Sequence, residues 1–220
     1  MVIETIQRDL DQASRLSRKA GSSKRFALLA SALALGLAAL SGLDACAPRG
    51  SGGSQAQSSG IGGAFTLVNQ DGKPVDQSVL KGKWSVVFFG YTFCPDFCPT
   101  TLTTLGKAMD KLGPKAAGAQ VVFVTVDPAR DTPPAMKTYI SSRVFPKNII
   151  GLTGTPAQIA QVAKEYGVYY AKDGTGSTYT MDHSTALYLM DPNGQYHGVI
   201  ADGLTPDQDA DQISKAMSGA

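Results

Sequence analysis

The chain has 220 residues, of which 43% are hydrophobic and 17% are charged, and its formal net charge is +2. This length and composition allow one ordinary domain with a buried core, plus shorter appendages. The small positive charge, much of which precedes the domain, argues against a nucleic-acid-binding surface.

The N-terminal part of the chain has the pattern of a membrane-targeting segment. Residues 1–26 are polar and basic, and Ala27–Leu43 carries no charge and has about the minimum length of a membrane-spanning helix. Because the basic residues come first, we expect 1–26 to be cytoplasmic and the rest to lie across the membrane. Leu43–Cys46 resembles a bacterial lipoprotein cleavage box, except at Asp44. Residues 27–46 are therefore expected to be either a transmembrane anchor or a lipoprotein-type signal, in which case Cys46 would be lipidated.

A change of composition separates this segment from the folded domain. Residues 47–60 are rich in Gly, Ser, Gln and Pro, which is typical of a flexible linker. We expect the domain to occupy residues 61–220.

Alternating strand and helix patterns fill this domain. The pattern predicts an N-terminal hairpin around Asp71-Gly72, an apolar strand at 84–89, a helix at 101–112, and a second apolar strand at 121–126. It then predicts a helix from about 131 to 143, a strand at 149–152, a helix at 155–166, a hairpin of 186–190 with 195–200, and a closing helix at 206–217. This order predicts an α/β fold with a mixed sheet flanked by helices, which is compatible with a thioredoxin-like fold.

Two of the chain's three cysteines, Cys94 and Cys98, lie between the strand at 84–89 and the following helix. Amide groups and the helix dipole at such a junction favour thiolates, whereas the charge of Asp96 opposes them. Three intervening residues would place both sulfurs on one face of a helical turn. From the spacing alone, a metal site, a disulfide and two unrelated buried cysteines all remain open.

Several other polar or soft side chains have ordinary structural interpretations. Met109 has the helical spacing of a core residue. Asp127 and Asp131 are expected to form a turn and to cap the next helix, for which Thr132 is the other candidate cap. Taken alone, the two histidines, His183 and His197, are each expected to be ordinary surface or hydrogen-bonded residues.

Four segments, in this order, resemble motifs of the Sco/SenC family of copper-handling proteins, which assist the assembly of cytochrome c oxidase. They are Phe89–Thr100, Val124–Pro133, Gly151–Thr155 and Tyr179–Ser184. The resemblance runs from about Ile61 to the C-terminus, so it covers the whole expected domain.

The resemblance implies a thioredoxin-like domain that binds Cu(I) and Cu(II) through Cys94, Cys98 and His183. It implies a metallochaperone rather than an enzyme, attached to the bacterial inner membrane and facing the periplasm. Its partners would be the copper-containing subunit of cytochrome c oxidase and other copper chaperones. It also suggests that the loop of Asp127 and Asp131 lies beside the cysteines, as a docking surface or an outer shell.

Two other functions use the same residues and stay open. The first is a periplasmic thiol–disulfide oxidoreductase that keeps the cysteines of an oxidase copper site reduced, with Cys94 and Cys98 as its redox-active pair. The second is a redox or copper sensor. Only the copper-binding functions require His183.

Overall fold

The computed structural model describes residues 60–219. The expected segments at 1–26 and 27–46, and all of the expected linker except residue 60, lie outside this range. No helix within 60–219 has the length and apolar character needed to cross a membrane.

A seven-stranded mixed sheet forms the centre of the domain, with the strand order β2-β1-β5-β4-β3-β8-β9. Its strands are β1 (Thr66–Asn69), β2 (Pro74–Asp76), β3 (Trp84–Gly90), β4 (Ala119–Thr125), β5 (Ile149–Thr153), β8 (Leu187–Met190) and β9 (Tyr196–Ile200). β4 pairs in parallel with β3 and β5, and the remaining pairs are antiparallel. A separate two-stranded sheet is formed by β6 (Tyr170–Asp173) and β7 (Thr180–His183).

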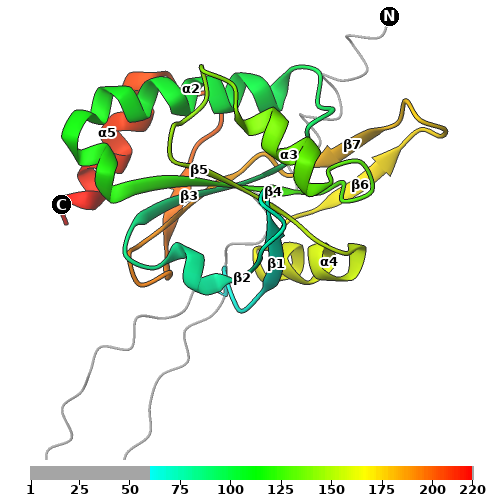
Figure 1. The fold of residues 1–220 in the computed structure, drawn as a ribbon. Coiled ribbons are helices and arrows are strands. Elements are labelled where there is room, and N and C mark those ends of the chain that lie inside the picture. Colours follow the sequence, from blue (N-terminus) through cyan, green and yellow to red (C-terminus); the bar gives the residue numbers. More distant parts are fainter. Residues whose placement is uncertain (1–59, 220) are drawn as a thin grey trace, which may run out of the picture. The chain divides into compact units, whose positions relative to one another are not determined.

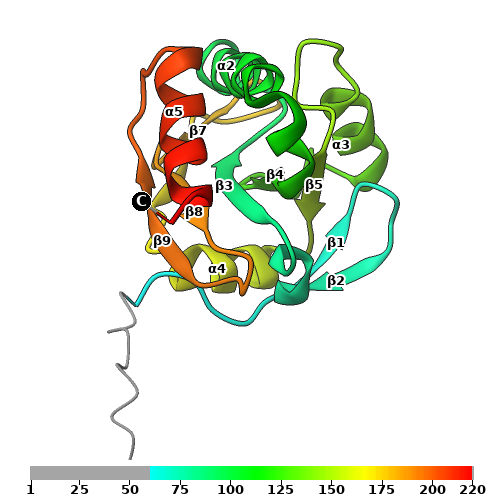
Figure 2. The same ribbon diagram turned by 90° about the vertical axis from the view of Figure 1, so that its left-hand side faces the viewer.

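Helices cover both faces of the large sheet. They are α2 (Phe97–Leu112), α3 (Pro133–Ile140), α4 (Pro156–Glu165) and α5 (Pro206–Met217), with short 3-10 turns at Gln77–Leu80 and Gly113–Gly118. α2 and α3 lie on one face and α4 on the other (Figure 1), and α5 packs beside α2 (Figure 2). The arrangement confirms the predicted α/β fold with a mixed sheet, an N-terminal hairpin and a C-terminal hairpin followed by a helix.

The interior is built from the apolar runs that the sequence pattern identified. Every residue of β4 is buried, as is every residue of β3 after Trp84, because helices cover both faces of these strands. Met109 is 4% exposed, which confirms its role in the core. Thr155 and Thr205 each form a capping box at the start of α4 and α5, so both helices begin where the pattern predicted.

The predicted bounds were wrong for two helices. α2 begins at Phe97 rather than 101, because Pro99 falls in the first turn, where a missing N–H breaks no helical hydrogen bond. α3 ends at Ile140 rather than 143. There the Ser141 hydroxyl donates to the Thr138 carbonyl at 2.7 Å. In a longer helix, this carbonyl would instead accept a hydrogen bond from a backbone N–H.

The β6–β7 hairpin was not predicted. Its strands are mostly exposed or half-buried, so they lack the apolar alternation that identifies a strand with one buried face. The hairpin pairs Tyr170 with His183 and Asp173 with Thr180, which leaves a connection of polar residues and glycines between the strands.

Asp209 is an unusual residue in the helix α5. It is 3% exposed, and its Oδ1 has no hydrogen-bond partner within residues 60–219. Burial disfavours the charged form and raises the pKa of Asp209 to about 6. An acid whose pKa is raised on folding destabilises the folded protein when it is ionised, so it lowers stability at neutral pH.

We therefore expect Asp209→Asn to raise the free energy of unfolding at pH 7 by about 1–2 kcal/mol. The gain should shrink as the pH falls from about 6 towards about 4, because the wild-type carboxyl is then protonated in the folded state. Chemical denaturation at several pH values measures this. Asp207→Asn is the control, because Asp207 is an exposed residue of the same helix that pairs with Lys111 of α2. This variant should not show the pH dependence. A variant that is less stable at every pH would contradict the prediction.

Candidate metal centre

The site is placed by the parallel pairing of β3 and β4. Gly90 at the end of β3 is paired with Thr125 at the end of β4. Because the strands are parallel, the loops that follow them leave the sheet at the same edge. The cysteine loop (residues 91–96) therefore lies beside the acidic loop (residues 126–132).

A buried carboxylate joins these two loops. Asp131 is 0% exposed and accepts hydrogen bonds from the Thr92 N–H at 3.0 Å, the Thr92 hydroxyl at 2.5 Å and the Thr125 hydroxyl at 2.6 Å. These bonds favour its charged form, although burial is the larger effect and raises the pKa of Asp131. Asp131 thus fixes the start of the cysteine loop from a position 39 residues along the chain.

This arrangement corrects the capping prediction. Thr132 occupies the cap position of α3 and makes no side-chain capping bond. The turn itself forms through the backbone, since the N–H groups of Arg130 and Asp131 donate to the Asp127 carbonyl. Asp127 and Asp131 are both buried, at 3% and 0% exposure. They therefore belong to the buried surroundings of the site and do not form a docking surface.

Both cysteines are free thiols at the predicted strand-to-helix junction, but their environments differ. Cys94 is half-buried in the loop, and Cys98 is buried in the first turn of α2. The Cys98 N–H donates to the Cys94 sulfur at 3.3 Å. Gly90 makes room for this turn, since a Cβ atom there would lie 2.7 Å from the Cys98 sulfur and 2.8 Å from the ring of Phe123.

The two thiols also ionise unequally. The neighbouring Cys98 side chain, together with backbone N–H groups and His183, lowers the pKa of Cys94 from 9.0 to about 5. The same interaction between the two thiols, followed by burial, raises the pKa of Cys98. The first proton therefore leaves from Cys94, and the charge that remains there opposes a second ionisation.

His183 approaches this pair from the β6–β7 hairpin. It is the last residue of β7. Its Nδ1 lies 2.9 Å from the Ser184 carbonyl oxygen, which can only accept, so Nδ1 carries the proton in this bond. Nε2 then presents a free lone pair, and it lies 3.8 Å from the Cys98 sulfur. Aromatic rings of Phe88, Tyr91 and Phe97 surround the imidazole.

The structure thus brings Cys98 next to both Cys94 and His183. Between residues 60 and 219, no group of three or more His, Cys, Asp or Glu residues has the spacing that would hold a metal ion. The three side chains are therefore not already arranged around one point. The donors would have to move closer to one another to bind one metal ion. His197 lies on β9 and packs edge-on against Trp84 with ring centroids 4.8 Å apart, in agreement with its ordinary structural interpretation.

Sequence reasoning missed three residues that shape the site. Thr92 and Gly90 fall within the cysteine motif, but their roles depend on partners that are distant in the sequence. Arg130 forms an ion pair with Asp127 and lies over the rings of two residues of the cysteine loop. The spacing of Arg130 from Asp127 was the only local signal for this pair.

The unequal thiols lead to a testable expectation. In the reduced, metal-free protein, iodoacetamide should alkylate Cys94 with a pH midpoint near its pKa of about 5, and should leave Cys98 largely unmodified. The thiolate is the nucleophile, so the rate should rise through this midpoint and then level off. Mass spectrometry of the modified peptides identifies the cysteine. A midpoint near 9.0, the ordinary value, would show that Cys94 is not activated.

Comparisons with known proteins identify the family of this chain. The family model described as SCO1/SenC matches residues 53–218. The protein SenC of Rhodobacter capsulatus is 41% identical over 166 residues, which cover 75% of this chain and 73% of that protein. The match to the mitochondrial SCO1 homolog 1 of Arabidopsis thaliana is 42% identical over 164 residues but spans only 48% of that relative's length.

Solved structures resemble the fold as well. The structure of Bradyrhizobium japonicum ScoI with copper bound has a TM-score of 0.65 and 43% identity, and the match covers 70% of this chain and 98% of that one. BsSco, described as a Sco-family cytochrome c oxidase assembly protein with a disulfide switch, has a TM-score of 0.56 and 27% identity, with 71% and 91% of the two chains covered. The fold is therefore the thioredoxin-like fold of the Sco structures, and the chain belongs to the SCO1/SenC family.

Proposed function

We propose that this chain is a copper metallochaperone that binds copper through Cys94, Cys98 and His183 and delivers it during the assembly of cytochrome c oxidase. The observation that carries the proposal is the approach of His183 Nε2 to within 3.8 Å of the Cys98 sulfur, beside Cys94. Membership of the family supports it, as do the copper in ScoI and the assembly role attributed to BsSco.

The chemistry of these donors fits copper. Two thiolates bind Cu(I) strongly, and an imidazole nitrogen makes the set acceptable to Cu(II) as well. In the neutral imidazole, the bond from His183 Nδ1 to the Ser184 carbonyl leaves the lone pair on Nε2 and orients the ring. A thiol must lose its proton to bind a metal, and Cys94 has already done so at neutral pH because its pKa is about 5.

Delivery also requires that the copper can leave. Cys94 is half-buried whereas Cys98 is buried, so an acceptor's thiolate would approach on the Cys94 side. A site with three protein ligands leaves a position open for that incoming sulfur, which allows stepwise exchange of ligands. The copper-containing subunit of cytochrome c oxidase is the proposed recipient, and other copper chaperones are the proposed donors.

The remainder of the chain fits a tethered carrier. We propose that residues 61–220 are the copper-binding domain, that 27–46 attach it to the bacterial inner membrane as an anchor or a lipoprotein-type signal, and that 47–60 are a linker on the periplasmic side. Residues 1–26 would then remain in the cytoplasm if the anchor is not cleaved.

One observation favours a second function, thiol–disulfide exchange. The low pKa of Cys94 and its contact with Cys98 are properties of a reactive dithiol, and BsSco is described as having a disulfide switch. This function would use the same cysteines without copper and without His183.

The two histidines offer a matched test of the copper site. His183→Ala should weaken copper binding by at least about tenfold and remove the nitrogen neighbour of the metal, since even outer-shell partners of metal-binding histidines contribute this much. His197→Ala should behave like the wild type. Copper stoichiometry and X-ray absorption of the reduced protein measure both effects.

Retention of full copper affinity by His183→Ala would contradict the three-ligand site. If the wild-type protein also keeps no copper under anaerobic, reducing conditions, while both variants still exchange disulfides, thiol–disulfide exchange becomes the better-supported function.

A further inference from the structure

The β6–β7 hairpin carries His183 but is not part of the large sheet. Within residues 60–219 its two strands pair only with each other, and Figure 1 shows the hairpin projecting from the body of the domain. The position of His183, at the end of β7, therefore depends on the contacts that hold this hairpin against the body.

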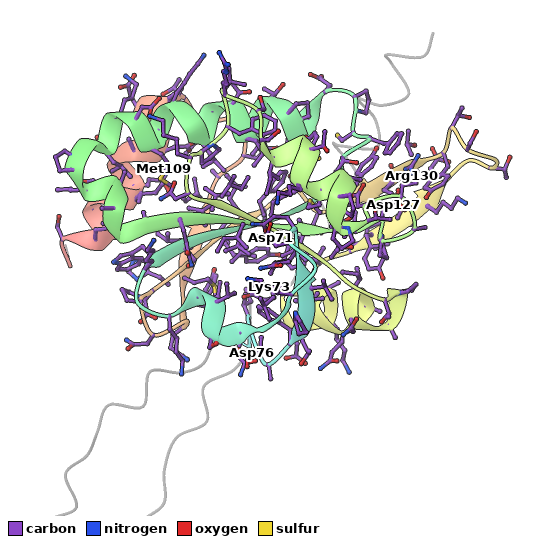
Figure 3. The ribbon with its side chains drawn as sticks, in the orientation of Figure 1. Asp71, Lys73, Asp76, Met109, Asp127 and Arg130 are labelled. Atoms are coloured by element: carbon purple, nitrogen blue, oxygen red, sulfur yellow. The ribbon has the colours of Figure 1, made fainter. Side chains whose placement is uncertain are left out.

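One group of such contacts, the Arg130 cluster, consists of Asp127, Arg130 and Tyr179. Arg130 Nη1 donates to the Tyr179 carbonyl at 2.9 Å, and its guanidinium carbon lies 3.5 Å from the centre of the Tyr179 ring. Arg130 Nε donates to Asp127 Oδ2, and the Tyr179 hydroxyl donates to Asp127 Oδ1 at 2.6 Å. Each member contacts the other two, and Figure 3 shows Asp127 and Arg130 together beside the hairpin.

The same guanidinium also reaches the cysteine loop. Its carbon lies 4.7 Å from the ring centre of Phe93 and 5.8 Å from that of Tyr91. Phe93 immediately precedes Cys94, and Tyr179 comes four residues before His183. One cation thus connects the two segments that carry the proposed copper ligands, through contacts of the cation–π type and through hydrogen bonds.

Burial strengthens this connection. The Asp127 side chain is 4% exposed and that of Arg130 is 13% exposed, so the ion pair lies in a medium of low polarity. Arg130 Nη2 is also buried, but it has no hydrogen-bond partner within residues 60–219. If the cluster opened, this N–H could bond to water, which would offset part of the free energy lost with the other contacts. The closed arrangement is therefore favoured but can open.

We infer that Arg130 is a positioning residue that closes the hairpin over the cysteine loop and thereby holds His183 next to the thiols. The inference rests on the proposed function, because it concerns the third copper ligand. When the cluster opens, the hairpin withdraws the imidazole nitrogen while both sulfurs remain on α2 and its preceding loop. A position on the metal is then free for the acceptor's donor atom.

Hydrogen exchange of the full-length, metal-free protein in detergent tests the closure without copper. Arg130→Gln should speed amide exchange in residues 170–183 by about tenfold, which corresponds to the loss of one cation–π contact and one or two hydrogen bonds. Exchange in β3 and β4 should not change. Lys137→Gln is the matched control, because it removes a cation that is paired with Asp71 outside the site, and it should leave the hairpin as in the wild type.

Two milder variants keep the test decisive if Arg130→Gln loosens the whole domain. Arg130→Lys keeps the charge but loses the planar group, and Tyr179→Phe removes only the hydroxyl bond to Asp127. Both should speed exchange in the hairpin alone, by less than Arg130→Gln does in a folded background. Unchanged hairpin exchange in these variants, or in a folded Arg130→Gln protein, would overturn the inference.

A copper measurement separates this inference from the proposed function. In copper-loaded Arg130→Gln, X-ray absorption should show both sulfur neighbours and a weakened nitrogen contribution, whereas the wild type should show all three. A wild type without the nitrogen would overturn the three-ligand proposal, even if the hairpin still loosened in the variant. A variant with a looser hairpin and an unchanged nitrogen contribution would show that Arg130 does not position His183.

Discussion

The parallel pairing of β3 with β4 is the constraint on which the site depends. It ends both strands at one edge of the sheet, so that the cysteine loop and the acidic loop lie side by side. The buried carboxylate of Asp131 then joins them through hydrogen bonds to Thr92 and Thr125. A buried carboxyl group that accepts three hydrogen bonds is costly to disturb, because removing one donor leaves a buried oxygen with fewer partners.

This framework gives the two cysteines different properties although they are close in the sequence. Cys98 is part of a helix and is packed so tightly against β3 that position 90 must be glycine. Cys94 lies in the loop, is partly accessible and receives the hydrogen bonds that favour a thiolate. One sulfur is therefore held rigidly and the other is reactive, which suits the proposed function of holding a metal ion and giving it up.

His183, the third proposed donor, belongs to a different structural unit. The cysteines are attached to the large sheet and to α2, whose backbone bonds are extensive, whereas His183 lies on a hairpin that pairs only with itself in the described part of the chain. Side-chain contacts around Arg130 replace the missing backbone bonds. Such contacts are individually weak and open more readily than a sheet does, so the site combines a rigid half with an adjustable one.

Much of the fold was accessible from local patterns alone. Apolar runs predicted β3 and β4, and the local pattern predicted helices at 155–166 and 206–217, which correspond to α4 and α5, because these elements depend on neighbours within a few residues. The same local reasoning placed Cys94 and Cys98 at a strand-to-helix junction. The tertiary structure alone decided that Asp131 is a buried support rather than a helix cap, that His183 ends a strand, and that Arg130 bridges both parts of the site. Asp131 bonds to a residue 39 positions away and Cys98 contacts one 85 positions away, and no local pattern encodes which distant loops a sheet will bring together.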